Sequence, residues 1–234
     1  MSIKKIITGL TLSLLLASGV ASAADFNKGV QAAQAGDFKT ALAEWTPLAE
    51  QGYASAQYNL GVMYRKGDGV PQNSKTAVKW YTKAAEQGDV DAQYNLGLMY
   101  DNGEGVPEND KTAVKWYTLA AKQGDAYAQY NLGNKYDRGE GVPENDKTAV
   151  KWFTLAAKQG YAKAQTNLGV MYRYGEGVLT DNRRAYMWYN LGSYNGNKKA
   201  GENKDKIAKR MTPADISKAQ DMSSRCLESN YTDC

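Results

Sequence analysis

Residues 54–88 read ASAQYNLGVMYRKGDGVPQNSKTAVKWYTKAAEQG, and the same pattern returns three more times at a constant spacing of 36 residues. A period of this length is typical of a repeat array. Two landmarks keep the step, the glycine that ends A-Q-x-N-L-G and a later tryptophan: Gly61, Gly97, Gly133 and Gly169, with Trp80, Trp116, Trp152 and Trp188. The chain therefore contains four units, at residues 53–88, 89–124, 125–160 and 161–196.

Each unit is predicted to form two helices joined by a glycine loop. In the first unit, apolar residues recur at close to helical spacing on both sides of the stretch Gly67-Asp68-Gly69-Val70-Pro71. Gly67 can adopt the left-handed conformation that ends a helix, and the proline prevents the helix from continuing. Asn73 and Ser74 then offer side-chain oxygens to cap the second helix, which Gly88 ends.

No single unit can bury its apolar face alone, so the units are predicted to stack. Residues 24–52 read as an N-terminal capping hairpin, with helices near 26–35 and 40–51. Residues 197–234 read as C-terminal capping helices, the last of which starts with Thr212 as its cap and Pro213 in the first helical position. The predicted fold is all-α: a right-handed α-solenoid superhelix of helix-turn-helix repeats with capping helices at both ends.

The unit resembles the Sel-one-like repeat, a relative of the tetratricopeptide repeat, in all four copies. Both flanks also look like those of exported proteobacterial members. The resemblance implies a scaffold that binds protein partners. One branch, the Cys-rich secreted proteins described as penicillin-binding or weakly β-lactamase-like, carries a cysteine pair in every repeat. No repeat of this chain contains a cysteine, so we do not carry that activity over.

The resemblance also implies that the first helix of each unit lines a concave groove. The positions that it marks as facing the groove form the predicted partner-binding site: Tyr58, Val62, Arg65, Lys66, Tyr94, Leu98, Asp101, Asn102, Tyr127, Tyr130, Asn134, Asp137, Arg138, Thr166, Val170, Arg173 and Tyr174. Tyrosine and arginine are frequent interface residues. An alternative, equally weighted, is that the tyrosines at 58, 94 and 130 pack between units.

One groove position changes its charge from unit to unit, as Arg65, Asp101, Asp137 and Arg173. A solenoid needs no such variation for its stability, because surface substitutions usually have small effects. We therefore interpret the alternation as complementary to a charged partner. On this interpretation, changing Asp101 and Asp137 to lysine leaves the melting temperature nearly unchanged.

The N-terminus reads as a bacterial signal peptide over residues 1–23. Lys4 and Lys5 precede a short apolar stretch, and Ala21-Ser22-Ala23 is an A-x-A cleavage site. The alternative, a retained membrane anchor, is disfavoured because the stretch is shorter than the roughly 20 residues that span a bilayer. Cleavage after Ala23 predicts a periplasmic or secreted protein that is not inserted in a membrane.

The composition excludes several classes of site. The chain has no histidine and only two cysteines, which excludes Ser/His/Asp triads, Cys/His nucleophile pairs, His-ligated metal sites, and Cys-ligated zinc and iron–sulfur clusters. The formal net charge is +4, and the basic residues form no long run, so nothing indicates nucleic acid. We expect no catalytic residues, no metal and no cofactor.

The glycine loops carry one acidic residue each, at Asp68, Glu104, Glu140 and Glu176. A general acid/base pair needs two carboxylates at one substrate, whereas these occur one per unit. A calcium loop is also disfavoured, because glycines occupy positions where oxygen ligands are needed. We interpret the acidic residues as solvated turn residues, and the repeated tryptophans as core.

The cysteines are Cys226 and Cys234, eight residues apart near the C-terminus. In an exported chain such a pair most often forms a structural disulfide. A redox or metal-binding role is the alternative, but the C-x-x-C spacing is missing.

These observations favour a non-catalytic adaptor, expected to be a monomer, that holds a peptide or a protein in its groove. The alternatives are a secreted factor directed at a host and, less favoured, a β-lactamase-like or penicillin-binding enzyme of the envelope.

Overall fold

A computed structural model describes residues 24–234, and the segment interpreted as a signal peptide lies outside them. The described part contains α-helices and no strand, so the all-α repeat fold is confirmed. The helices are α1 Phe26–Gln34, α2 Phe38–Glu50, α3 Ala54–Lys66, α4 Ser74–Glu86, α5 Val90–Asn102, α6 Asp110–Lys122, α7 Ala126–Arg138, α8 Asp146–Ala157, α9 Ala162–Tyr174, α10 Asn182–Tyr194, α11 Lys198–Ala208 and α12 Pro213–Glu228.

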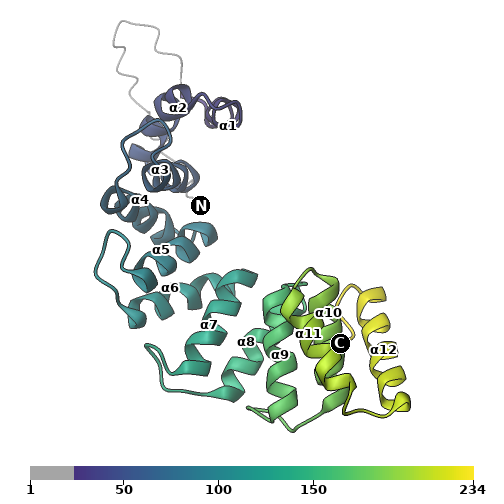
Figure 1. Cartoon of the computed structure of the whole chain (residues 1–234). Coiled ribbons are helices and arrows are strands. Elements are labelled where there is room, and N and C mark those ends of the chain that lie inside the picture. Colours follow the sequence, from purple (N-terminus) through teal and green to yellow (C-terminus); the bar gives the residue numbers. More distant parts are fainter. Residues whose placement is uncertain (1–23) are drawn as a thin grey trace, which may run out of the picture.

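The helices follow one another along an arc, and neighbours in the sequence are neighbours in space (Figure 1). The core lies between units as much as within them. One apolar cluster joins α4 to α5 of the next unit and also takes in Trp116 of α6, and equivalent clusters follow along the array. This shared core explains why the units must stack, because each unit buries its apolar residues against its neighbours.

Repeated local signals set the helix ends. Gly67 ends α3 in the left-handed conformation, with φ of 82°, and its equivalents end α5, α7 and α9 in the same way. Asn73 caps α4 by accepting a 3.0 Å hydrogen bond from the backbone N–H of Thr76. The expected turn and cap are thus confirmed at each of these loops.

The second glycine of each loop joins consecutive units. A Cβ atom on Gly105 would lie 2.5 Å from the backbone carbonyl of Ser74, the first residue of α4 in the preceding unit. Gly141 and Gly177 approach Asp110 and Asp146 in the same manner. Each glycine loop therefore sits on the start of the second helix of the unit before it.

The N-terminal hairpin differs slightly from the expected bounds. Its second helix starts at Phe38 rather than near residue 40, because Asp37 is the cap and accepts a 3.1 Å hydrogen bond from the backbone N–H of Thr40. Trp45 packs on Gly29, and its indole N–H donates to the carbonyl of Phe26. The hairpin thereby covers the apolar face of α3.

The C-terminal end is closed by two helices. Both α11 and α12 pack on α10, and Thr212 caps α12 as expected, with Pro213 in its first turn. Cys226 and Cys234 form a disulfide with a Cα–Cα distance of 4.8 Å, which confirms the predicted pairing. Cys226 is fully buried, so the bridge ties the end of the chain to the core.

The repeated tryptophans are core residues to different degrees. Trp116 and Trp188 are buried, whereas Trp80 and Trp152 are half-buried and pack against the clusters of neighbouring units. Within residues 24–234, no helix combines the length and the apolar character that crossing a membrane requires.

Candidate interaction surface

The predicted groove residues all lie on α3, α5, α7 and α9, the first helices of the four units. In Figure 1, α3, α5 and α7 lie toward the inner side of the arc. Their exposure is uneven. The exposed members are Lys66, Asn102, Tyr127, Arg138 and Tyr174, and the half-buried members are Tyr58, Val62, Arg65, Tyr94, Leu98, Asp101, Tyr130, Asn134, Asp137, Val170 and Arg173.

Thr166 does not belong to this surface. Its side chain is only 4% exposed, and its hydroxyl donates a 2.7 Å hydrogen bond to the carbonyl of Ala162 on the same helix. Its oxygen also lies close to Gly192 of α10. The assignment of Thr166 to the groove is therefore wrong, because the end of the array covers it.

The groove tyrosines at the first helices pack on the second helix of their own units, and Tyr94 and Tyr130 also contact a tyrosine of the next unit, as the alternative interpretation expected. The rings of Tyr58, Tyr94 and Tyr130 lie 5.8, 6.2 and 5.8 Å from the rings of Tyr81, Tyr117 and Phe153 on the following helix. Each of the three also stays half-exposed. The three tyrosines therefore contribute to packing between the two helices of each unit and remain partly accessible to solvent.

Four tyrosines form one cluster across three units, which we call the tyrosine cluster: Tyr94, Tyr127, Tyr130 and Tyr161. The Tyr127 ring lies 5.9 Å from that of Tyr94 and 5.1 Å from that of Tyr161, which in turn lies 5.1 Å from Tyr130. Tyr127 remains 53% exposed, whereas burial raises the pKa of Tyr161 to about 12. The cluster thus has one partly buried member, Tyr161, and one member that is accessible to solvent, Tyr127.

Sequence reasoning missed Tyr161. It stands at the position where the second and third units have the helix-capping residues Asp89 and Asp125. That difference between near-identical units was the available signal.

Two of the four variable charges, Arg65 and Asp101, have ion-pair partners in the structure, which the sequence interpretation did not foresee. At the first junction, between units one and two, the Nε atom of Arg65 lies 3.3 Å from both carboxylate oxygens of Glu104. Ser74 Oγ lies 3.3 Å from the same carboxylate, and a guanidinium nitrogen of Arg65 donates to Asn95. Glu104 is therefore not a solvated turn residue, but a link to the preceding unit.

At the second junction the charges are reversed. Asp101 replaces the arginine and Asp110 replaces the serine, so their two carboxylates converge with that of Glu140 in the loop. The ammonium of Lys135 lies among them, in contact with Asp101, 2.7 Å from Asp110 and 2.9 Å from Glu140. Burial lowers the pKa of Lys135, but the hydrogen bonds to the three carboxylates outweigh it and the pKa is raised.

Lys135 was also missed. It is 6% exposed and occupies the position of Met63, Met99 and Met171 in the other units. Because Asp101 is its partner, we expect Asp101→Lys to lower the melting temperature, in contrast to the nearly unchanged value expected from the sequence for the change at Asp101 and Asp137. Asp101 also accepts a 3.0 Å hydrogen bond from the Tyr117 hydroxyl, which adds to its structural role.

The third junction has the acidic residues without the lysine. Asp137, Asp146 and Glu176 occupy the positions of Asp101, Asp110 and Glu140, and Met171 stands where Lys135 would be. Burial and the neighbouring Asp146 raise the pKa of Asp137, and burial followed by Asp137 and Asp146 raises that of Glu176. This junction therefore lacks the buried lysine of the second junction, and the charge of Arg138 offsets only part of the effect on Asp137.

Metal binding finds no support in this part of the chain. Among residues 24–234, no group of three or more His, Cys, Asp or Glu side chains is arranged to hold a metal ion.

Comparisons with known proteins agree with the repeat pattern. The family model of the Sel1 repeat matches residues 54–89, 90–125, 126–161 and 162–197. A Sel1 repeat protein from Oxalobacter formigenes is 37% identical, covering 75% of this chain and 72% of its own, with a TM-score of 0.72. A protective antigen of uropathogenic Escherichia coli with an SLR fold is 30% identical, covering 90% of this chain and 56% of its own, with a TM-score of 0.55. No curated protein matches the chain.

Proposed function

Since this chain belongs to the Sel1 repeat family, whose members are generally non-catalytic scaffolds for protein interactions, we propose that it is an exported adaptor that binds a protein or peptide partner in its groove. The proposed surface runs over α3, α5, α7 and α9 and has the tyrosine cluster at its centre. The protein acts on its partner by holding it and catalyses no reaction.

The observation that carries this proposal is Tyr127. A tyrosine that is half-exposed and packs against two other rings loses little conformational freedom on binding and presents both an apolar ring and a hydroxyl. Arg138, at the other end of the same helix, and Asn102, at the corresponding end of α5, are exposed and supply polar contacts at the rim of the groove.

Export is the second part of the proposal. It is supported by the pattern of residues 1–23 and by the disulfide, which persists in oxidising compartments. N-terminal sequencing of the protein from the envelope or the medium should begin at Ala24. An intact Met1 in that fraction would contradict export.

The groove is tested by affinity capture from an envelope extract with three baits. The wild type and Tyr194→Ala should retain the same partner, because Tyr194 is an exposed tyrosine outside the cluster. Tyr127→Ala should lose it while its melting temperature stays close to that of the wild type. Equal retention by Tyr127→Ala would place the binding surface elsewhere.

A further inference from the structure

The tyrosine cluster has a carboxylate beside it. Asp125 caps α7 by accepting a 2.6 Å hydrogen bond from the backbone N–H of Ala128, and it stands two residues before Tyr127. Burial and then the charge of Asp125 raise the pKa of Tyr94. Asp125 also contributes, after burial and the neighbouring tyrosines, to the raised pKa of Tyr161. This carboxylate therefore lies close to cluster tyrosines of the units before and after it.

A second carboxylate lies on the same side of the cluster. Asp91 is in the first turn of α5, at the position that Tyr127 has in α7, and its side chain is exposed. Burial raises the pKa of Asp125, and the charge of Asp91 raises it further. The two carboxylates of consecutive units are thus close enough to repel one another, where α5 and α7 meet the cluster.

No cation of the described chain pairs with these carboxylates. Among residues 24–234, neither of them forms an ion pair. The charge of Arg65 also acts on Tyr94, but the guanidinium is engaged with Glu104 and Asn95. Lys163 has the corresponding position in α9, and within the same residues it makes neither an ion pair nor a cation–π contact. The cluster therefore has an acidic side at α5 and α7 and a lysine at α9.

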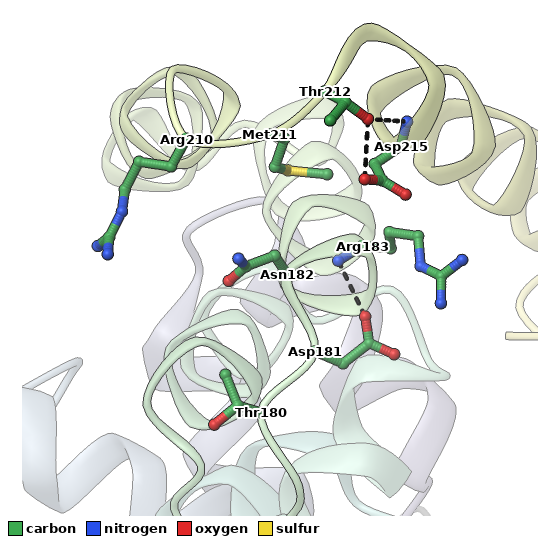
Figure 2. A pocket seen from close by; sticks show the side chains of 8 residues that line it. All are labelled: Thr180, Asp181, Asn182, Arg183, Arg210, Met211, Thr212 and Asp215. Atoms are coloured by element: carbon green, nitrogen blue, oxygen red, sulfur yellow. Dashed lines mark hydrogen bonds between the residues drawn. The ribbon is translucent and has the colours of Figure 1, made fainter.

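The cavity at the start of α10 shows the opposite arrangement. Figure 2 shows Asp181 and Asp215 in the same cavity as Arg183 and Arg210. Acidic and basic side chains are present there in equal numbers, so the cavity has no clear preference for the charge of a ligand. The acidic side of the tyrosine cluster, by contrast, favours a cation.

Aromatic rings and carboxylates together suit one kind of side chain. A cation over the face of a tyrosine ring is attracted by the ring, and the more so where water is displaced. A guanidinium is planar, so it can stack on a ring while its edge donates hydrogen bonds to a carboxylate. Tyr127 is 53% exposed, so its ring is accessible for such stacking close to Asp125.

We propose that the tyrosine cluster, together with Asp91 and Asp125, binds an arginine side chain of the partner. This inference rests on the proposed function and deepens it, because it names the chemistry that the groove recognises. Lys163 repels a second positive charge, so the arginine binds at the α5 and α7 side of Tyr127.

The probes are two short peptides, GARAG and the same peptide with citrulline in place of arginine, both acetylated and amidated at their ends. Citrulline has nearly the shape of arginine but carries no charge. Each peptide is titrated into the protein at low salt, and binding is followed by the ring resonances of Tyr127. The arginine peptide should shift these resonances and bind at least about fivefold tighter than the citrulline peptide. Salt at about 0.5 M should remove most of this preference.

Two double variants complete the test. Asp91→Asn with Asp125→Asn removes both charges, and an asparagine at 125 can still cap α7, so the protein should stay folded and lose the preference for arginine. The matched control, Asp205→Asn with Asp221→Asn, removes two exposed carboxylates from α11 and α12 and should keep the preference. An unchanged preference in the first double variant would overturn the inference.

Two further outcomes separate this inference from the proposed function. Equal affinity for the two peptides, as expected of a neutral ligand that only stacks on Tyr127, would overturn the inference. In affinity capture, loss of the partner by both Tyr127→Ala and the double variant at Asp91 and Asp125, each with a melting temperature close to that of the wild type, supports both proposals. If this double variant keeps a partner that Tyr127→Ala loses, the groove stands and this inference falls.

Discussion

The ammonium of Lys135, in the third unit, donates a 2.7 Å hydrogen bond to Asp110, in the second. This bond crosses a junction between repeats whose sequences are otherwise nearly copied. Three carboxylates surround the lysine, so its charge is compensated inside a position where the other units have methionine. The charge differences between units are therefore matched by ion pairs across the first and second junctions, whereas the third junction has the acidic residues without the lysine.

Lys135→Met should destabilise the protein. The substitution restores the residue of the other units but leaves Asp101, Asp110 and Glu140 to repel one another. We expect a loss of about 2–3 kcal/mol at neutral pH, less than for a fully buried ion pair because the carboxylates are partly exposed. Urea denaturation at pH 7 in low and in high salt should show the loss shrinking as salt screens the repulsion between the carboxylates. An equal loss at both salt concentrations would contradict the charge explanation.

Met171→Lys should stabilise the third junction by about 1 kcal/mol at neutral pH, because it adds the missing cation. The raised pKa values of Asp137 and Glu176 mean that their destabilising effect is complete above the folded pKa and disappears below the unfolded one. The gain should thus be present at pH 7 and absent near pH 3. The matched control is Met99→Lys, which places a lysine beside Arg65 and should destabilise.

Gly105→Ala should weaken the contact between units one and two. The left-handed φ of 73° costs any L residue about 1–2 kcal/mol, and the new Cβ would also collide with the carbonyl of Ser74. Gly88→Ala is the control, since it has a positive φ but no atom within 4 Å of the added Cβ. We expect Gly105→Ala to lower the free energy of unfolding by about 1–3 kcal/mol more than Gly88→Ala does, as measured by thermal denaturation. Equal losses of stability in the two variants would show that the glycine loop moves to accommodate the added Cβ atom at little cost.

Removing the disulfide should cost about 2–3 kcal/mol, because the closed loop is short. The comparison is between the oxidised wild type and Cys234→Ser, in which Cys226 stays in its buried site. Thiol labelling of the denatured, unreduced wild type should find no free thiol. Two reactive thiols would contradict the pairing.

Most of the fold could be predicted because its signals are local and repeated. A left-handed glycine, a capping asparagine and the pair Thr212-Pro213 each act within a few residues. The candidate site was harder. Arg65 and Glu104 are 39 residues apart, and their pairing depends on how one unit sits on the next. Without that packing, Arg65 was interpreted as a partner-binding residue and Glu104 as a solvated turn residue.

The burial of Thr166 has the same origin. Its position is half-exposed as a tyrosine in the first three units, and the sequence offers no reason for the fourth to differ. The difference arises because Gly192 of α10 packs closely against both Thr166 and Ala200 of α11. Contacts at the end of an array do not follow from the repeat.

The placement of each glycine loop on the unit before it gives the array a direction of growth. The surface that receives a loop is always encoded earlier in the chain than the loop itself, as Ser74 precedes Gly105 and Asp146 precedes Gly177. A chain delivered N-terminus first, from a ribosome or through a translocation channel, can add every new unit to one that is already folded. If the C-terminus were delivered first, each glycine loop would emerge before the helix on which it packs.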